Sequence, residues 1–355
     1  MGTDMQPLKP PAQPNAAERG VASVGGSERR LPNAREGRFE VLSRLKGQAT
    51  WVTLALILML LVLGVLSEPF ATSGNLANIL RNFAFIAIVA LGQMLVIVTA
   101  GIDLSVGSVM ALAGVTTAAI MSQGHSIGFG IAGGLGAALV FGWVNGWLIS
   151  RFKISAFVVT LGTLSIGRSI CMAVTEGRPV SDFGPDAELF FALGGSELLG
   201  IAMPVWILLG LAIVMALTLR LSAWGKHVFA IGSNEHAAEL TGVPVDRVKI
   251  SVYMISSLLA GIGGILLTSF LSSVTANLAE GYELRVIASA VIGGANLMGG
   301  EGSVYGAIVG ALLIEVIRNG LLLLGVDPYW QGTFVGLFIV LAVLLQRMRG
   351  TRGST

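Results

Sequence analysis

Charged residues are scarce in this sequence. Lys, Arg, Asp and Glu together account for 12% of its 355 residues, whereas a soluble domain carries about 25%. Hydrophobic residues account for 54%, and glycine occurs 48 times. So much apolar surface cannot be hidden from water, and small residues allow membrane helices to approach closely. The composition therefore predicts a polytopic membrane protein and excludes an ordinary soluble domain.

Residue patterns that carry catalysis or bind metals are equally sparse. The one cysteine, Cys171, excludes an internal disulfide and a cysteine-based metal cluster, and its apolar surroundings favour a packing role. The three histidines have no metal-ligand spacing, and the phosphate-binding pattern G-x-x-x-x-G-K-[ST] is absent. We therefore expect a chain that binds no metal or cofactor itself and does not hydrolyse ATP in the P-loop manner.

A polar tail precedes the apolar part of the sequence. Residues 1–48 hold eight Lys or Arg and five acidic residues and lack the pattern of a cleaved signal peptide. They predict a disordered cytoplasmic tail that binds no nucleic acid. A spanning helix needs about 20 mostly apolar residues. The expected spans are 51–67, 83–100, 104–121, 127–149, 156–174, 204–219, 251–271, 284–298, 303–324 and 332–345.

The eighth of these runs is short and interrupted by glycine, so it either spans the membrane or re-enters on one side. Lys and Arg concentrate in cytoplasmic loops, and the basic residues of this sequence recur on the side of the N-terminal tail. On that side lie Arg151, Lys153, Arg220, Lys226, Arg247, Lys249, Arg347, Arg349 and Arg352. Both termini are therefore expected inside, with a membrane domain at 49–347 and a short cytoplasmic tail at 348–355.

Two G-x-x-x-G pairs, at 142–146 and 306–310, predict close contacts between helices. The longest hydrophilic connection after the tail, 221–250, holds a different kind of feature. Glu235, Ala237 and Ala238 lie there in a short helix-forming segment that Gly242 can end in a left-handed turn and Pro244 can stop. Small alanines permit close docking, so the segment is suited to contact a soluble partner, although an ordinary loop helix also fits the pattern.

Polar residues within the apolar runs are candidates for a transport path. Asp103 would be costly if it faced lipid, by a few kcal/mol, so it either caps the helix beginning near Ser105 or lines a path, and the two roles are compatible. Glu315 and Arg318 are spaced to pair on one helix, and Arg168 is expected to reach the outer interface. The candidates for the path or gate are Gln93, Asp103, Ser105, Asn145, Thr160, Thr163, Asn296 and Glu301.

Several motifs together resemble a known family. They are GIDLSVGS at 101–108, VTLGT at 159–163, AIGSN at 230–234, GYEL at 281–284, VIGG at 291–294 and GGEGS at 299–303. Over residues 72–347 the sequence resembles the membrane-spanning permease subunits of bacterial ABC importers for monosaccharides, of the ribose, xylose and arabinose type. That resemblance implies an all-α fold of about ten transmembrane helices, similar to the permeases of vitamin importers, in the inner membrane.

The resemblance also implies partners and a function. A pentose or hexose would be delivered by a periplasmic sugar-binding protein, and ATP and Mg would bind a cytoplasmic ATPase. A second permease copy, identical or related, would complete the pore. Glu235, Ala237, Ala238 and Gly242 look like the loop with which such permeases dock into their ATPase. Alternative functions are an ABC permease for a nucleoside or a branched-chain amino acid, and an ion-coupled secondary transporter, for which the spans hold few ionisable residues.

Overall fold

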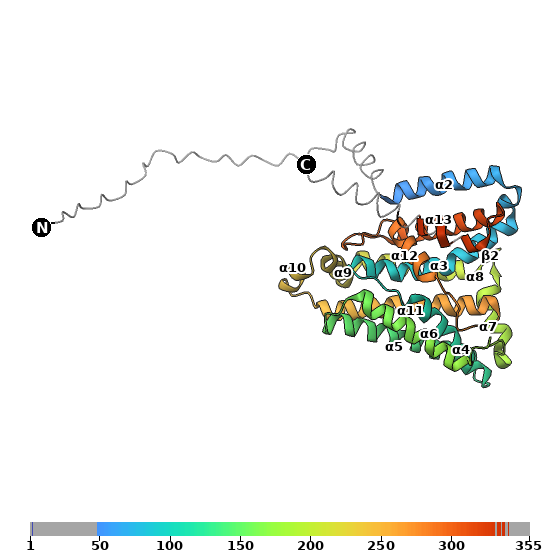
Figure 1. Cartoon of the computed structure of the whole chain (residues 1–355), viewed down its shortest axis with the longest axis horizontal. Helices are drawn as coiled ribbons and strands as arrows, with labels where there is room; N and C mark the ends of the chain where they lie inside the picture. The colour runs from blue at the N-terminus through green and yellow to red at the C-terminus, as the bar shows by residue number, and fades with distance from the viewer. Residues whose placement is uncertain (1, 3–47, 331, 335, 338–339, 341–355) are drawn as a thin grey trace, which may run out of the picture. The chain divides into compact units, whose positions relative to one another are not determined.

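In a computed structural model, the described residues are 48–330, residue 2 and positions 332–334, 336, 337 and 340. Almost all of the predicted tail 1–48, most of the predicted span 332–345 and the predicted tail 348–355 lie outside them. The described residues from 48 onward belong to one compact unit, residues 45–355. This unit is built almost wholly from helices (Figure 1).

The elements follow one another in a bundle of long helices with short connections. Their bounds are α2 (Gln48–Leu66), η1 (Glu68–Ala71), α3 (Ser73–Val98), α4 (Val106–Ser122), α5 (Ile127–Arg151), α6 (Ala156–Thr175), η2 (Gly184–Asp186), α7 (Ala187–Gly195), β1 (Glu197–Leu198), β2 (Ile201–Ala202), α8 (Met203–Leu221), α9 (Ala223–Ser233), α10 (Glu235–Leu240), α11 (Val245–Leu271), α12 (Tyr282–Ile292), α13 (Val304–Leu323) and η3 (Pro328–Trp330). The two strands form a small antiparallel hairpin.

Seven helices of the described part are long and apolar enough to cross a membrane: α2, α3, α5, α6, α8, α11 and α13. The apolar helix α4 has 17 residues, which at about 1.5 Å per residue gives roughly 25 Å. That is slightly less than the bilayer core of about 30 Å. The predicted all-α membrane fold is confirmed, and eight of the predicted runs correspond to these helices.

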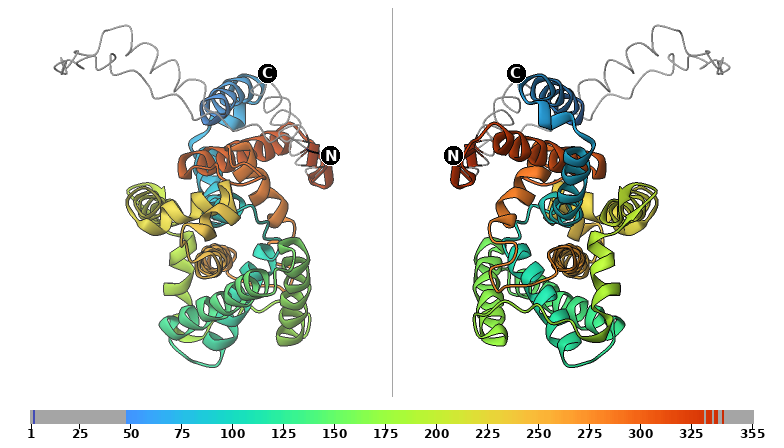
Figure 2. Two further views of the ribbon diagram at one scale, coloured as in Figure 1. Left: turned by 90° about the vertical axis from the view of Figure 1, so that its left-hand side faces the viewer. Right: turned by 90° about the vertical axis from the view of Figure 1, so that its right-hand side faces the viewer.

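Two ends of the bundle can be distinguished. The helices α9 and α10 lie at one end, and α7 with the β1–β2 hairpin lies at the other (Figure 1). We call these the α10 end and the hairpin end. The α11 helix passes through the middle of the bundle, surrounded by other helices (Figure 2). Beside it, every residue of α3 from Phe83 to Val98 is buried.

The predicted eighth span, 284–298, is not one helix. α12 has 11 residues, or about 16 Å, half of a bilayer core. The chain before it, 272–281, contains no helix in the structure, and it starts at the hairpin end, where Val274 bridges to Val180. After α12 the chain reaches the end of α3, where the Gly300 N–H donates to the Val98 carbonyl. An irregular segment and a short helix therefore cross the bundle together, and the interruption expected in this run is found at Gly293 and Gly294, where α12 ends.

Glycines allow the central helices to pack in backbone contact, as both predicted G-x-x-x-G pairs show. A Cβ added to Gly142 would come within 2.6 Å of the Tyr253 carbonyl oxygen, and one added to Gly146 within 2.6 Å of Ile250 Cα, so α5 lies directly on the α11 backbone. Gly306 and Gly310 bring α13 equally close to the end of α12. In lipid the hydrophobic effect does not drive helices together, so close van der Waals contacts of this kind stabilise their association.

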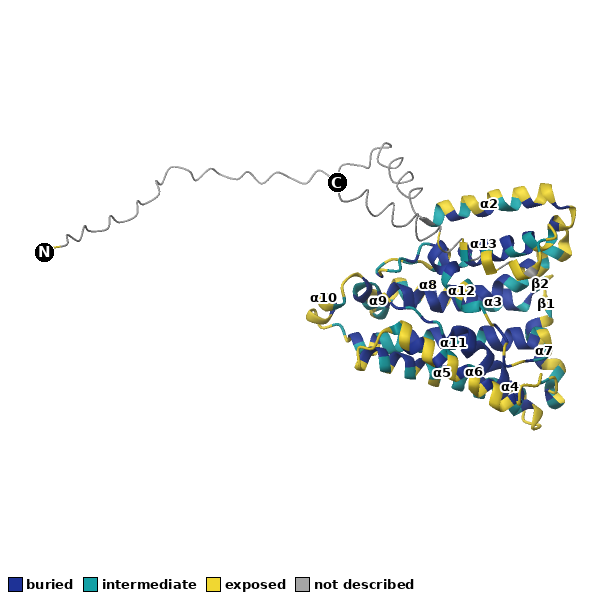
Figure 3. Ribbon diagram, in the orientation of Figure 1, coloured by how far each residue is buried: buried dark blue, intermediate teal, exposed yellow. Residues whose placement is uncertain are grey.

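The outer faces of the bundle are exposed, most visibly on α2 (Figure 3), and many of the exposed side chains are large and apolar. Leu58, Leu61 and Val65 of α2 are more than half exposed, as are Ile213 and Val214 of α8. In a water-soluble protein such faces would be unstable, but lipid tails are as apolar as these side chains. The pattern of exposure therefore agrees with a multi-pass membrane protein.

Candidate functional site

A non-helical loop, 99–105, separates α3 from α4 inside the bundle, and Asp103 lies in it with no exposed surface. Its Oδ1 accepts hydrogen bonds from the Ser105 N–H (2.9 Å) and the Ser105 hydroxyl (2.6 Å). Its Oδ2 accepts one from the Ser256 hydroxyl of α11 (3.3 Å). The carboxylate thus forms a local turn with Ser105, the residue directly before α4. Its hydrogen bonds among the described residues do not include an N–H group of the first turn of α4, so it lies beside the helix start without forming the expected cap.

The backbone of this loop is held from two other helices. The Gln93 amide of α3, in the orientation that satisfies both of its groups, donates to the Asp103 carbonyl (3.1 Å) and accepts from the Asp103 N–H (3.2 Å). The Thr160 hydroxyl of α6 donates to the Ile102 carbonyl (3.3 Å). A side-chain amide therefore supplies the hydrogen bonds that a broken helix leaves unmade, as burial in an apolar interior requires.

Asn145 of α5 completes the group. Its Nδ2 donates to the Ser105 hydroxyl (2.9 Å), and its Oδ1 has no hydrogen-bond partner within the described part. We call these residues the Asp103 cluster: Gln93, Asp103, Ser105, Asn145, Thr160 and Ser256. Five of the eight predicted path residues meet here, and Ser256 is the member that the sequence did not single out. Their placement in a path stays a prediction.

The other three predicted path residues lie elsewhere. Thr163 donates to the carbonyls of Val159 and Thr160 in its own helix, at 3.2 Å each. Asn296 and Glu301 belong to the turn after α12, where the Asn296 N–H donates to the Glu301 carbonyl (3.0 Å) and Glu301 is exposed. The structure therefore does not bring these three to the Asp103 cluster.

Arg168 has partners that the sequence did not show. Its Nη1 donates to the carbonyls of Ala276 (2.8 Å) and Leu278 (2.6 Å) in the irregular segment before α12. Glu283, at the start of α12, lies against Gly107 at the start of α4, close to the same guanidinium. The sequence signalled a functional or structural role for Arg168 because it lies in the middle of an apolar run, but its partners distant in the chain could not be predicted from the sequence.

The expected Glu315–Arg318 pair does form, through both carboxylate oxygens.

At the α10 end, the segment predicted from Glu235, Ala237 and Ala238 is a helix of six residues. Asn234 caps it, accepting a hydrogen bond from the Ala237 N–H (2.9 Å). Gly242 follows with φ of +85°, the left-handed conformation in which a side chain would be strained. The Val243 N–H then donates to the Ala238 carbonyl (3.1 Å), which closes the helix.

One face of α10 is anchored and the other is open. Ala238 is 5% exposed and packs on the bundle, whereas Leu240 is 76% exposed. His236, Ala237, Glu239 and Gly242 are exposed as well. The exposed face of α10 therefore combines one large aliphatic side chain with small and polar residues.

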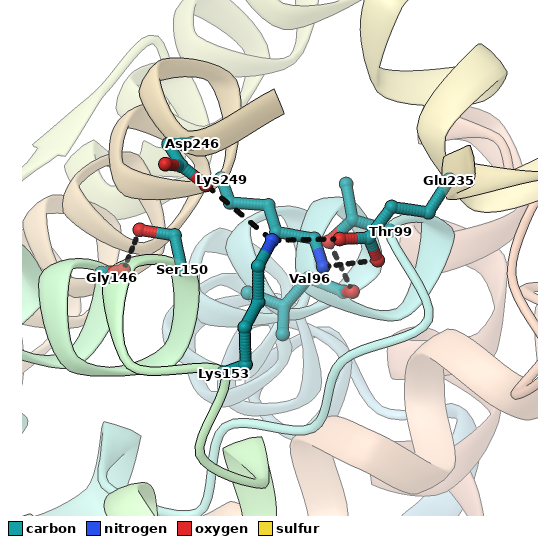
Figure 4. A network of polar contacts seen from close by, with 8 residues as sticks. All are labelled: Val96, Thr99, Gly146, Ser150, Lys153, Glu235, Asp246 and Lys249. Atoms are coloured by element: carbon teal, nitrogen blue, oxygen red, sulfur yellow. Dashed lines mark hydrogen bonds and ion pairs between the residues drawn. The ribbon is translucent and has the colours of Figure 1, made fainter. Parts of the chain in front are cut away.

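Ion pairs connect α10 to two neighbouring elements (Figure 4). Glu235 lies 2.6 Å from Lys249 of α11 and 3.5 Å from Lys153 in the α5–α6 turn, and Lys153 lies 3.6 Å from Asp246. We call these four residues the α10 network. Partial burial alone would raise the pKa of Glu235, but the hydrogen bond and charge of Lys249, with those of Lys153, hold it below its ordinary value.

A cavity of about 220 Å³ opens beside the α10 network. The residues that line it include Glu235, Lys153 and Lys249 together with 99–101, Ile154 and Tyr253. The cavity therefore lies between the exposed α10 segment and the loop that carries the Asp103 cluster.

This arrangement can be compared with known proteins. Residues 75–343 match the family described as "Branched-chain amino acid transport system / permease component". The chain belongs to this permease family. Among curated relatives, the permease is 37% identical over 300 residues to the ribose import permease protein of Haemophilus influenzae, with 84% of this chain and 93% of that protein covered.

Two further relatives cover similar lengths. The Escherichia coli K12 ribose import permease is 38% identical over 298 residues, covering 83% of this chain and 92% of that protein. The L-arabinose transport system permease of the same organism is 36% identical over 280 residues, covering 79% and 84%. These matches are to permease components, in agreement with the prediction that the permease is not itself the ATPase.

Proposed function

We propose that this permease is the translocation subunit of an ATP-driven importer for a monosaccharide of the ribose or arabinose type, in a bacterial inner membrane. The observation that carries the proposal is the likeness to ribose and arabinose permeases over most of the chain. The family description names branched-chain amino acids instead, so such a solute is the second candidate.

The open face of α10 is the docking site for a cytoplasmic ATPase. This assignment is supported by the exposure of Leu240 and by the small residues around Leu240, which let a partner approach closely. The α10 end also holds Arg151, Lys153, Arg220, Lys226, Arg247 and Lys249. Because Lys and Arg accumulate on the cytoplasmic side, this end faces the cytoplasm, and the hairpin end faces the periplasmic sugar-binding protein.

The α10 network connects the docking site of the ATPase to the membrane domain, so a movement of the ATPase can be transmitted through it. Glu235 is held by Lys249 on α11, and α11 also carries Ser256, which donates to Asp103. A displacement of α10 would therefore move a helix that contacts the loop between α3 and α4. This loop is where we propose that alternating access is controlled, with a second permease copy, identical or related, completing the pore.

Ten crossings remain consistent with this arrangement. Seven long helices, α4 and the irregular crossing with α12 make nine in the described part. The apolar run 332–345 would supply the tenth and return the chain to the cytoplasmic side, as the basic residues after it require. This count is also that of the vitamin-importer type of permease fold expected from the sequence.

Uptake into vesicles separates the candidate functions. The permease would be reconstituted with its ATPase and binding protein, and uptake of radiolabelled D-ribose measured with unlabelled L-arabinose, a nucleoside or leucine as competitors. We expect ATP-dependent ribose uptake that arabinose reduces and leucine does not. Competition by leucine alone would replace the sugar with a branched-chain amino acid, and uptake driven by an ion gradient without ATP would contradict the importer.

A further inference from the structure

The connection between α12 and α13 presents a large apolar side chain to solvent. Met298 is 82% exposed, which exceeds the 76% of Leu240 on α10. Glu301, three residues later, is exposed as well, and its carboxylate forms no ion pair with another described residue. We call residues 296–301 the Met298 turn. Figure 1 shows this part of the chain, in orange, at the α10 end.

The backbone of the Met298 turn is held by hydrogen bonds within the turn. The Met298 N–H donates to the Asn296 Oδ1 (3.0 Å), and the Gly299 N–H donates to the Asn296 carbonyl (2.8 Å). Gly299 and Gly300 have φ of +89° and +78°, a conformation that strains any residue with a side chain. Only the backbone of Met298 takes part in these bonds, so the turn forms without requiring an apolar side chain at this position.

The Met298 turn and α10 are supported by the same part of the bundle. A Cβ added to Gly300 would come within 2.9 Å of the Ser233 hydroxyl oxygen, so the turn lies against the end of α9. Ser233 is followed directly by Asn234, the cap of α10. The six residues of α10 span about 9 Å, whereas a standard interface covers about 800 Å² on each partner, a disc roughly 30 Å across. One partner is therefore large enough to cover Leu240 and Met298 together.

The charge of this surface favours a protein over a lipid surface as the partner. No Lys or Arg occurs between Arg285 and Arg318, and α10 adds the exposed Glu239 to the exposed Glu301. The cytoplasmic face of a membrane is anionic and attracts Lys and Arg, so it repels an acidic turn. A protein can instead place a basic side chain opposite Glu301 and an apolar pocket around Met298, whose unbranched side chain adapts to the shape of a pocket.

We propose that the Met298 turn is a second contact site for the cytoplasmic ATPase, beside α10. Met298 enters an apolar pocket of the ATPase, and Glu301 pairs with a basic residue there. The inference rests on the proposed function and adds to α10 a surface at the opposite side of the α9 end. The Gly300 N–H donates to the Val98 carbonyl (2.9 Å), so the ATPase contacts an element that is bonded to the end of α3, where the loop 99–105 begins.

Protection of a thiol tests the contact in the full-length permease in lipid nanodiscs. Cys171, the one cysteine of the sequence, is buried, so Met298→Cys adds a single accessible thiol. We expect a fluorescent maleimide to label it rapidly. Labelling should be about tenfold slower with the purified ATPase at about ten times its Kd, which leaves about a tenth of the permease free. Leu240→Cys should be protected as well, whereas Leu199→Cys, at a leucine of the hairpin end that is 85% exposed, should not.

Charge reversal tests the role of Glu301. We expect Glu301→Lys to weaken ATPase association about fivefold at low salt, the upper range for an exposed ion pair. The difference from the wild type should shrink at high salt, because salt screens exposed charges. Glu188→Lys, at an exposed glutamate of α7 on the hairpin end, is the matched control and should bind the ATPase normally. Unchanged association of Glu301→Lys at low salt would contradict the charge pairing.

The labelling results separate failure of this contact from failure of the proposed function. If the ATPase protects Leu240→Cys but not Met298→Cys, the second contact is wrong and docking on α10 stands. If Met298→Cys is labelled slowly before any ATPase is added, the side chain lies in lipid and the contact is again wrong. If the ATPase neither binds nor protects either position, the proposed function itself is rejected.

Discussion

The Asp103 cluster and the α10 network are both polar, but they differ in exposure and in the groups that bind each charge. Asp103 is fully buried and is held by the N–H and hydroxyl of Ser105 in its own loop and by the hydroxyl of Ser256 in the middle of α11. Glu235 is part-exposed and is held by Lys249, whose side chain is mostly buried, and by Lys153, whose side chain is mostly exposed. Removing a partner from a buried group leaves others unsatisfied, whereas exposed ion pairs contribute little. The comparison teaches that the buried cluster contributes more to the stability of the fold than the partly exposed network does.

The largest effect is expected from Asp103→Ala. It leaves the Ser105 N–H and the hydroxyls of Ser105 and Ser256 without their acceptor, so we expect a loss of about 2–4 kcal/mol of stability. Thermal unfolding in detergent measures it. Asp182→Ala is the matched control, because Asp182 makes the same hydrogen bond to the N–H two residues later, in an exposed turn. Equal effects of the two substitutions would contradict the difference between buried and exposed sites.

The second effect concerns association. Leu240→Glu places a charge in the open face of α10, and we expect at least about a tenfold weaker association with the ATPase, or about 1.4 kcal/mol. The folded permease should be as stable as the wild type. Co-purification and uptake measure the result. Leu199→Glu, at an equally exposed leucine of the hairpin end, should leave ATPase binding intact; a similar loss there would remove the special role of α10.

The third effect compares the contributions of the two lysines of the α10 network to ATP-driven uptake. Lys249→Met removes the 2.6 Å contact with Glu235, and Lys153→Met removes contacts of 3.5 and 3.6 Å from a side chain that is 60% exposed. We expect Lys249→Met to slow ATP-driven uptake more than Lys153→Met, with less than about 1 kcal/mol of stability lost in either. The reverse order of uptake rates would show that the α5–α6 turn, rather than α11, receives the motion.

The smallest effect is a pH dependence. The pKa of Glu235 lies below its ordinary value of 4.5, so its ion pairs stabilise the fold fully above that value. This contribution is lost as the pH falls through the lowered pKa. The stability difference between the wild type and Glu235→Gln, below about 1 kcal/mol for so exposed a pair, should therefore shrink in acid. If the difference instead grew below pH 4.5, the pKa of Glu235 in the folded protein would be raised rather than lowered.

The sequence predicted what depends on local patterns. Apolar runs identified eight of the helices, the glycine pairs identified two close contacts, and the spacing of Glu315 and Arg318 identified their ion pair. Asp103 was expected beside the start of α4 and is found there, bound to Ser105, the residue directly before that helix. Gly242 was expected to end α10 and has the required φ.

What the sequence could not predict depends on partners distant in the chain. The run 284–298 is apolar and reads as a helix, but the path of the chain before α12 depends on Arg168, more than 100 positions earlier. Tyr253 looks like any aromatic residue in a span, and only the approach of Gly101 shows where its hydroxyl lies. Neither pairing leaves a periodic signal.

The irregular crossing has a consequence for how the permease is made. A segment without a helix cannot enter lipid alone, because its carbonyls would have no partners there. The carbonyls of Ala276 and Leu278 are satisfied by Arg168 of α6. We therefore expect segment 272–281 to enter the membrane more readily once α6 is in place. Loss of the Arg168 side chain would leave these two carbonyls without their donor, and we expect impaired insertion during synthesis.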